Sequence, residues 1–248
     1  MDGMTDILVL GIGTAGARAC YYLNQRQALG NAQIIGIDSD EEHLASLTPL
    51  ETLPVPKPPA LPAGAQATAA CEALENGIAN ALGKTRMAAI VTCLGGDTAA
   101  FYTQAALLCC QKAGIPAVTF AAMPHAFDSQ EQKNGATQTL DVLRAQHFDV
   151  VTLECTRLGA LLPECSSVDA YRLAVLWLVD TAIGYLTIFA QRKRFSTVTS
   201  ETSSQNSSLA MKFNDMPRGI FSGTPPTVHN QEDLDIPTCL RRNLDLQQ

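Results

Sequence analysis

Short apolar runs alternate with longer helical patterns along the first two thirds of the chain. The runs are rich in β-branched residues and end at glycine, proline or aspartate, which is typical of buried strands. They predict strands at residues 7–10, 33–37, 51–55, 87–92, 116–121 and 148–153. Helical patterns follow the first strand and recur at 41–47, 65–82, 98–113 and 130–146. This alternation predicts an α/β fold, with a parallel sheet covered by helices on both faces.

A glycine-rich turn joins the first strand to its helix, with the spacing Gly11-x-Gly13-x-x-Gly16. Glycine permits a tight turn and a close approach of the backbone to a phosphate, and the following helix points its free N–H groups at that anion. In a strand–turn–helix context this spacing predicts a nucleotide phosphate site. The alternative is a tight turn that needs glycine and binds no ligand.

Acidic residues follow the second strand, in the stretch Asp38-Ser39-Asp40. An acid about 20 residues beyond such a glycine turn is where a Rossmann fold reads a ribose hydroxyl, which favours an NAD(P)-linked oxidoreductase. The alternative is that an aspartate caps the next short helix. The histidines at 43, 125 and 147 are isolated in the sequence, and no catalytic pairing accompanies them.

A long apolar pattern at residues 168–190 has its polar positions on one narrow stripe. A membrane span needs about 20 apolar residues and avoids charge near its middle, whereas this run carries Asp180. A buried core helix is therefore the preferred interpretation. Residues 192–230 are rich in serine and threonine and predict a flexible linker, and residues 231–248 form a tail in which apolar and acidic residues alternate before two arginines.

Composition narrows the function classes. Of the 248 residues 46% are hydrophobic and 17% are charged, and the net charge of -7 argues against a nucleic-acid partner. The eight cysteines show no paired Cys-x-x-Cys spacing, so no metal site is expected and a reducing, cytoplasmic setting fits best. The acidic N-terminus does not have the pattern of a signal peptide.

Three features together resemble the FtsZ/tubulin-like GTPase family. The first is the glycine turn, Gly11 to Gly16, with the strand that follows it. The second is the order of elements from 87 to 149, with the turn Gly95-Gly96-x-Thr98 and the stretch Pro124-x-x-Phe127. The third is the tail 233–242, which is similar to the C-terminal peptide of FtsZ.

This resemblance implies a Rossmann-like GTPase domain at 5–191 that ends in the long helix, followed by the linker and a partner-binding peptide. GTP or GDP is the implied cofactor. The implied nucleotide-binding residues are Gly11, Gly13, Thr14, Ala15, Gly16, Arg18, Asp40, Gly95, Gly96 and Thr98. The implied partner-binding residues of the tail are Leu234, Asp235, Ile236, Pro237, Leu240 and Arg241.

The implied partners are a membrane tether or division regulator for the tail, and a second copy or a full-length FtsZ for the long helix. The latter contact is expected through an exposed apolar flank that includes Trp177 or Tyr185. The implied location is the cytoplasm, with recruitment to the division site at the membrane.

The sequence also departs from the family pattern. Asp97 places a carboxylate in the phosphate loop, and Phe101 adds bulk there. Val175 and Leu176 stand where the family reads guanine with polar side chains, and no acidic catalytic loop follows the long helix. We therefore expect a degenerate GTP site without catalytic residues. The alternatives are a GTPase whose hydrolysis is completed by a partner, and the oxidoreductase above.

Overall fold

The computed structural model describes residues 7–58, 65–157, 165–200, 228–229 and 232–233. Contacts divide the chain into two units, Met1–Ser200 and Glu201–Gln248. In the second unit the described residues form an antiparallel pair, β7 (Val228–His229) with β8 (Glu232–Asp233). The predicted partner-binding residues, from Leu234 to Arg241, lie outside the described residues.

The first unit is built on a six-stranded parallel sheet with the order β3-β2-β1-β4-β5-β6. The strands are β1 (Ile7–Ile12), β2 (Gln33–Asp38), β3 (Glu51–Pro54), β4 (Met87–Cys93), β5 (Ala117–Ala122) and β6 (Asp149–Leu153). The chain runs outward in one direction from β1 to β3 and in the other from β4 to β6. The strand order therefore reverses between β1 and β4. The chain that leaves β1 enters α1 on one face of the sheet, and the chain that leaves β4 enters α4 on the other face.

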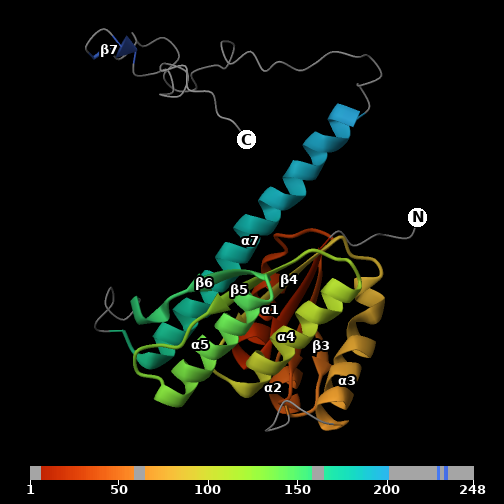
Figure 1. Ribbon diagram of the computed structural model, residues 1–248, viewed down its shortest axis with the longest axis vertical. Coiled ribbons are helices and arrows are strands. Elements are labelled where there is room, and N and C mark those ends of the chain that lie inside the picture. The colour runs from red at the N-terminus through yellow and green to blue at the C-terminus, as the bar shows by residue number, and fades with distance from the viewer. Residues whose placement is uncertain (1–6, 59–64, 158–164, 201–227, 230–231, 234–248) are drawn as a thin grey trace. The chain divides into compact units, whose positions relative to one another are not determined.

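Helices cover both faces of this sheet (Figure 1). They are α1 (Gly13–Arg26), α2 (Glu41–Ala45), α3 (Ala65–Leu82), α4 (Asp97–Lys112), α5 (Gln130–Ala145) and α7 (Ser167–Ser200). Alternate residues of β1 serve the two faces: Ile7 and Val9 pack in the cluster with α1 and α7, and Leu8 and Leu10 pack with α3 and α4. The fold class is confirmed, and the predicted bounds of the strands and of α2 to α5 agree with the structure to within two residues.

The long helix differs from its prediction at one end. The sequence predicts that it ends at 190 and that a linker begins at 192, but α7 continues to Ser200. The stretch from 191 to 200 contains neither glycine nor proline, and serine and threonine lower helix propensity without terminating a helix. The boundary between the helix and the predicted linker therefore lies about ten residues further along the chain.

One face of α7 belongs to the core. Ala174, Leu178, Val179, Ala182 and Leu186 are all buried in the cluster that includes α1 and the sheet. Within the described residues, the segment Ser167–Phe189 is long and apolar enough to cross a membrane, judged by length and a mean hydropathy of 1.5 alone. Of its most apolar stretch of 18 residues, 33% are buried. The helix thus combines a core face with an open apolar face.

Candidate functional site

The first glycine turn is held by backbone packing. A Cβ atom at Gly11 would lie 2.3 Å from the carbonyl oxygen of Gly16, and one at Gly16 would lie 2.4 Å from the carbonyl oxygen of Val91. Gly13 has a φ of +75°, which favours glycine at the start of α1. Gly11 and Gly16 are therefore required by the close approach of α1 to β1 and β4, and Gly13 is favoured by its positive φ, with or without a phosphate.

A buried carboxylate organises the end of the sheet beside this turn. Asp38, at the end of β2, is 2% exposed. Its Oδ2 accepts a hydrogen bond of 2.9 Å from the Thr14 hydroxyl and lies 3.2 Å from Nδ1 of His43. Its Oδ1 accepts a bond of 2.7 Å from the Ser39 N–H. Both carboxylate oxygens are thus engaged by groups of the protein itself, as the cost of burying a charge requires.

This network extends to the second glycine turn. The hydroxyls of Ser39 and Thr98 lie 2.9 Å apart, which connects the end of β2 to the first turn of α4. The structure therefore brings together Thr14 and Thr98, two of the predicted nucleotide-binding residues, at the edge of the sheet where β1, β2 and β4 end. Side-chain hydrogen bonds span the space between the two glycine turns.

Other predicted residues have different surroundings. Asp40 is exposed and caps α2, because its carboxylate accepts a 3.0 Å hydrogen bond from the His43 N–H. This geometry is the capping role that the sequence offered as an alternative. Ala15 is half-buried and Arg18 is exposed, both within the first two turns of α1.

The second glycine turn begins α4 with a negative charge. Gly95 has a φ of +119°, and Gly96 is the N-cap residue of α4 and has no side chain to cap the helix. Asp97 is the first residue of α4 and is exposed. A carboxylate there interacts favourably with the positive end of the helix dipole, which is the place that a bound phosphate would otherwise occupy.

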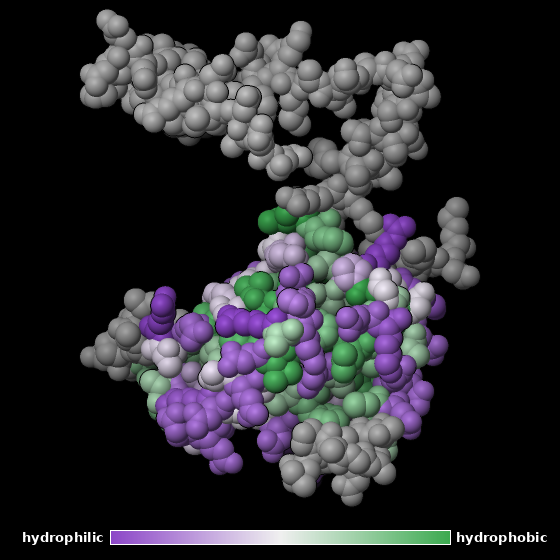
Figure 2. Space-filling view, in the orientation of Figure 1, coloured by the Kyte–Doolittle hydropathy of each residue, from purple (hydrophilic) through white to green (hydrophobic). Residues whose placement is uncertain are grey.

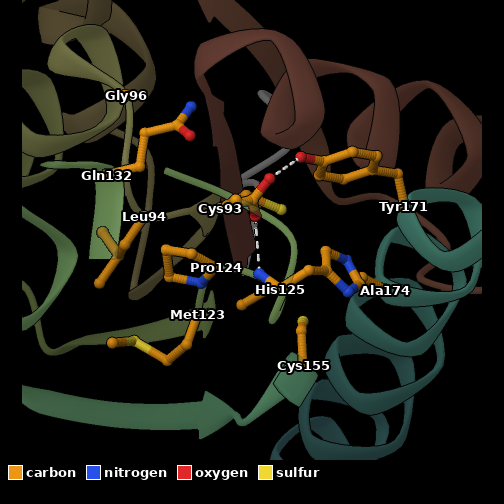
Figure 3. A pocket seen from close by; sticks show the side chains of 13 residues that line it. Cys93, Leu94, Gly96, Met123, Pro124, His125, Gln132, Cys155, Tyr171 and Ala174 are labelled. Atoms are coloured by element: carbon orange, nitrogen blue, oxygen red, sulfur yellow. Dashed lines mark hydrogen bonds between the residues drawn. The ribbon is translucent and has the colours of Figure 1, made fainter. Parts of the chain in front are cut away.

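A cavity of about 150 Å³ lies on the other side of this turn, at the carboxyl ends of β4, β5 and β6 and against α7 (Figure 3). Such a place commonly holds ligands in parallel α/β sheets. The side chains and backbone that line it are those of Cys93, Leu94, Gly95, Gly96, Ala122, Met123, Pro124, His125, Asp128, Gln132, Cys155, Tyr171 and Ala174.

His125 is the central polar group of this cavity. It is 3% exposed, its ring stacks on Phe127 at 4.9 Å, and Tyr171 contacts it edge-on at 4.8 Å. Its Nε2 is buried without a hydrogen-bond partner among the described residues. Burial lowers the pKa of His125 below its usual value, against a smaller opposing effect of Asp128, so the ring is neutral at pH 7.

Asp128 is the acidic residue of the cavity, and both of its carboxylate oxygens accept hydrogen bonds from the protein. One oxygen accepts a hydrogen bond from the Tyr171 hydroxyl, and the other accepts one of 2.6 Å from the His125 N–H (Figure 3). Burial raises the pKa of Cys93 and of Cys155 to about 12, so both thiols are neutral at physiological pH. Among the described residues that line the cavity, none is lysine or arginine.

The sequence interpretation missed this constellation. It treated His125 as isolated, whereas the structure places it with Phe127, Asp128 and Tyr171. The signal that could have found it is the stretch from Pro124 to Asp128, which follows the end of β5 directly. No group of side chains suited to hold a metal ion occurs in the described part of the chain.

Comparison with solved structures shows the FtsZ/tubulin-like fold. The chain is similar to an empty FtsZ dimer from M. jannaschii, with a TM-score of 0.65 and 21% sequence identity over 75% of this chain and 55% of that one. It is also similar to CetZ from Methanosaeta thermophila, with a TM-score of 0.57, 17% identity and coverage of 74% and 54%. TubZ of Clostridium botulinum phage c-st gives a TM-score of 0.54, 16% identity and coverage of 71% and 58%.

The chain therefore has the FtsZ/tubulin GTPase-domain fold and spans about 55% of the length of the FtsZ structure. The resemblance seen in the sequence is confirmed at the level of the fold. No family model matches the chain, and no curated protein matches it.

Proposed function

We propose that this chain is an FtsZ-like cytoskeletal protein with a degenerate GTP site, which acts by association and not by hydrolysis of its own. The fold supports the cytoskeletal part of this proposal. The acidic residues beside the two glycine turns support the part of the proposal that concerns a degenerate GTP site.

The observation that carries the proposal is the placement of carboxylates at both turns. Asp38 is buried beside the first turn and Asp97 is exposed at the start of the second. A nucleotide phosphate at this edge would meet two negative charges, and like charges about 4 Å apart repel by roughly 1 kcal/mol in water and by several at lower effective dielectric. The adjoining cavity offers no lysine or arginine among the described residues that line it.

The residues at the positions expected to contact the guanine base also support a degenerate GTP site. Val175 is 5% exposed and packs in the core cluster, and Leu176 is half-buried. Neither side chain has a hydrogen-bonding group. A purine bound against them would leave polar edges without partners, at a cost of roughly 1–3 kcal/mol for each buried group.

Association is proposed to use two regions. The exposed apolar flank of α7 would contact a second copy or a full-length FtsZ. The sequence places this flank at Trp177 or Tyr185, and the amino-terminal half of the helix also exposes Val168, Tyr171 and Leu173, of which Val168 is 66% exposed. The tail from Leu234 to Arg241 would bind a membrane tether or division regulator, which would recruit the protein from the cytoplasm to the division site.

A second candidate is a GTP-binding protein whose hydrolysis is completed by a partner. One observation favours it: the N-terminus of α1 has no side-chain cap, so its N–H groups remain available to an anion, and Arg18 is exposed nearby. The oxidoreductase alternative has less support. It needs a free Asp38 carboxylate, and both oxygens of that group accept hydrogen bonds from the protein.

The proposal is tested by assembly and phosphate release. Sedimentation of the purified chain, with and without GTP, is expected to give the same distribution, and phosphate release is expected to stay at background. GTP-dependent assembly with steady phosphate release would contradict it. Phosphate release that appears only when a full-length FtsZ is added, and that exceeds the release by that FtsZ alone, would favour the second candidate.

A further inference from the structure

The carboxyl-terminal half of α7 has a different surface from its amino-terminal half. Tyr185 is 45% exposed and Ile188 is 59% exposed, while Leu186 between them is fully buried. Trp177, Thr181, Gly184, Tyr185 and Ile188 recur at spacings of three and four, so they share one side of the helix. In Figure 2 hydrophobic residues gather at the end of the body from which α7 leaves the sheet.

The chemistry of the sequence changes just beyond Ile188. Residues 181–200 contain no aspartate or glutamate, and they include Arg192, Lys193 and Arg194 in succession. The helix continues through these residues to Ser200, so the bases lie one to two turns past Ile188 on a continuous helix (Figure 1). In a chain with a net charge of -7, this is a segregated basic end.

Aromatic residues accompany this apolar surface. Trp177 is half-buried on α7, and Tyr21 and Tyr22 are half-buried on α1, which packs against α7 in the same cluster. Arg26, at the end of α1, pairs with Asp180 of α7, which is the one acid between Trp177 and Ser200. Tryptophan and tyrosine with flanking lysine and arginine are the residues that proteins place at a membrane–water interface.

We propose that the part of α7 from Trp177 to Ser200 binds the surface of an anionic membrane directly. Tyr185 and Ile188 enter the interface between headgroups and acyl chains, and the bases at 192–194 bind anionic headgroups. The helix lies on the membrane and does not span it, because Leu178, Val179 and Leu186 are buried against the sheet.

Charge decides between a membrane and a second copy of the chain as the occupant of the surface from Trp177 onward, which leaves the amino-terminal part of α7 for a contact with a protein. The bases need a negative partner, and the same segment of a second copy offers one acid, Asp180, which already pairs with Arg26. The inference goes beyond the proposed function, because it requires neither the tail nor a protein tether. It also does not depend on whether the chain binds a nucleotide.

The test is flotation of the full chain with vesicles of phosphatidylcholine, with and without phosphatidylserine. Binding is expected only with phosphatidylserine, and it is expected to weaken as the salt concentration rises. The triple variant Arg192→Gln/Lys193→Gln/Arg194→Gln is expected to lower the partition coefficient by about 100-fold, at roughly fivefold for each base. Ile188→Ser is expected to weaken binding by about tenfold through lost apolar burial.

Matched variants keep the test decisive. Lys57, Lys84 and Arg144 are exposed bases outside α7, and replacing all three with glutamine removes the same charge with little expected loss of binding. Val142→Ser, on the surface of α5, matches Ile188→Ser. Circular dichroism shows that each variant is folded.

Several outcomes would overturn the proposal. The first three are equal binding to both kinds of vesicle, no binding to either, and unchanged binding by the triple variant. The fourth is loss of binding only in Arg241→Gln/Arg242→Gln, which would assign the membrane contact to the tail. Oligomers in solution without vesicle binding would show instead that this surface is a contact between protein chains.

Discussion

The Thr14 hydroxyl donates a hydrogen bond of 2.9 Å to a buried carboxylate oxygen of Asp38. This bond joins the turn after β1 to the end of β2, at the edge of the sheet where the sequence predicts a phosphate. A residue expected to contact a nucleotide thus stabilises a buried charge of the protein itself. The relationship yields a direct prediction for the stability of the chain.

Thr14→Val removes this donor and keeps the shape of the side chain. The free energy of unfolding is expected to fall by about 1–2 kcal/mol, because a buried carboxylate loses one of its partners. Chemical denaturation measures the loss. Thr137→Val is the matched control, since Thr137 is exposed on α5 and bonds only the Lys133 carbonyl, and its effect is expected to stay within about 0.5 kcal/mol. Equal losses in the two variants would contradict the role given to Thr14.

Gly16→Ala tests whether the glycine turn serves packing. The added methyl group would lie 2.4 Å from the Val91 carbonyl oxygen, so α1 must shift away from β4. A destabilisation of about 2 kcal/mol or more is expected in the absence of any nucleotide. Gly135→Ala, in open space on α5, is expected instead to be neutral or stabilising by up to about 1 kcal/mol. A Gly16→Ala protein as stable as the parent would contradict the packing argument.

The lowered pKa of His125 predicts a dependence of stability on pH. Its pKa is below the ordinary value of 6.5 in the folded chain, so the unfolded chain binds the proton first. The contribution of the neutral ring is fully present above pH 6.5 and is lost as the pH falls from there toward the lower folded value. His125→Gln is therefore expected to lose less stability than the parent between about pH 7 and pH 5.

The measurement is the midpoint of urea denaturation across that range of pH. His147→Asn replaces an exposed histidine and serves as the control, and it is expected to follow the parent. Parallel curves for the parent and His125→Gln would show that burial of this ring does not couple to protonation.

Much of the fold could be predicted from the sequence, because its signals are local. The buried strands are short apolar runs, and Gly11, Gly13 and Gly16 mark a turn that the backbone requires. The end of α7 at Ser200 was not predictable from composition, since a serine- and threonine-rich stretch after a long helix reads equally as a linker.

The candidate site was less predictable. Thr14 and Asp38 are 24 residues apart, and Ser39 and Thr98 are 59 apart, so their contacts follow from the order of the strands. The same holds for Asp128 and Tyr171, which come from the loop after β5 and from α7. Sequence spacing alone indicates which residues lie at strand ends, and the packing of the elements decides which of them meet.

The tail carries a prediction that depends only on its sequence. Ile236→Ala together with Leu240→Ala is expected to weaken the binding of an FtsZ-tail-binding partner by at least about tenfold, since each removes an apolar anchor. Fluorescence anisotropy of labelled full-length chain measures this affinity. Asn243→Ala, outside the predicted anchors, is the control. Unchanged affinity in the double variant would refute the anchor assignment.

Equilibrium titration of GTP tests the central claim most directly. Calorimetry on the purified chain at low salt is expected to give no saturable binding at micromolar GTP, because Asp38 and Asp97 oppose a phosphate and the cavity offers no cation among its described residues. Asp97→Gly is expected to strengthen whatever binding exists, since it removes one repulsive charge. Saturable micromolar binding of GTP by the parent chain, unchanged in Asp97→Gly, would contradict the degenerate site.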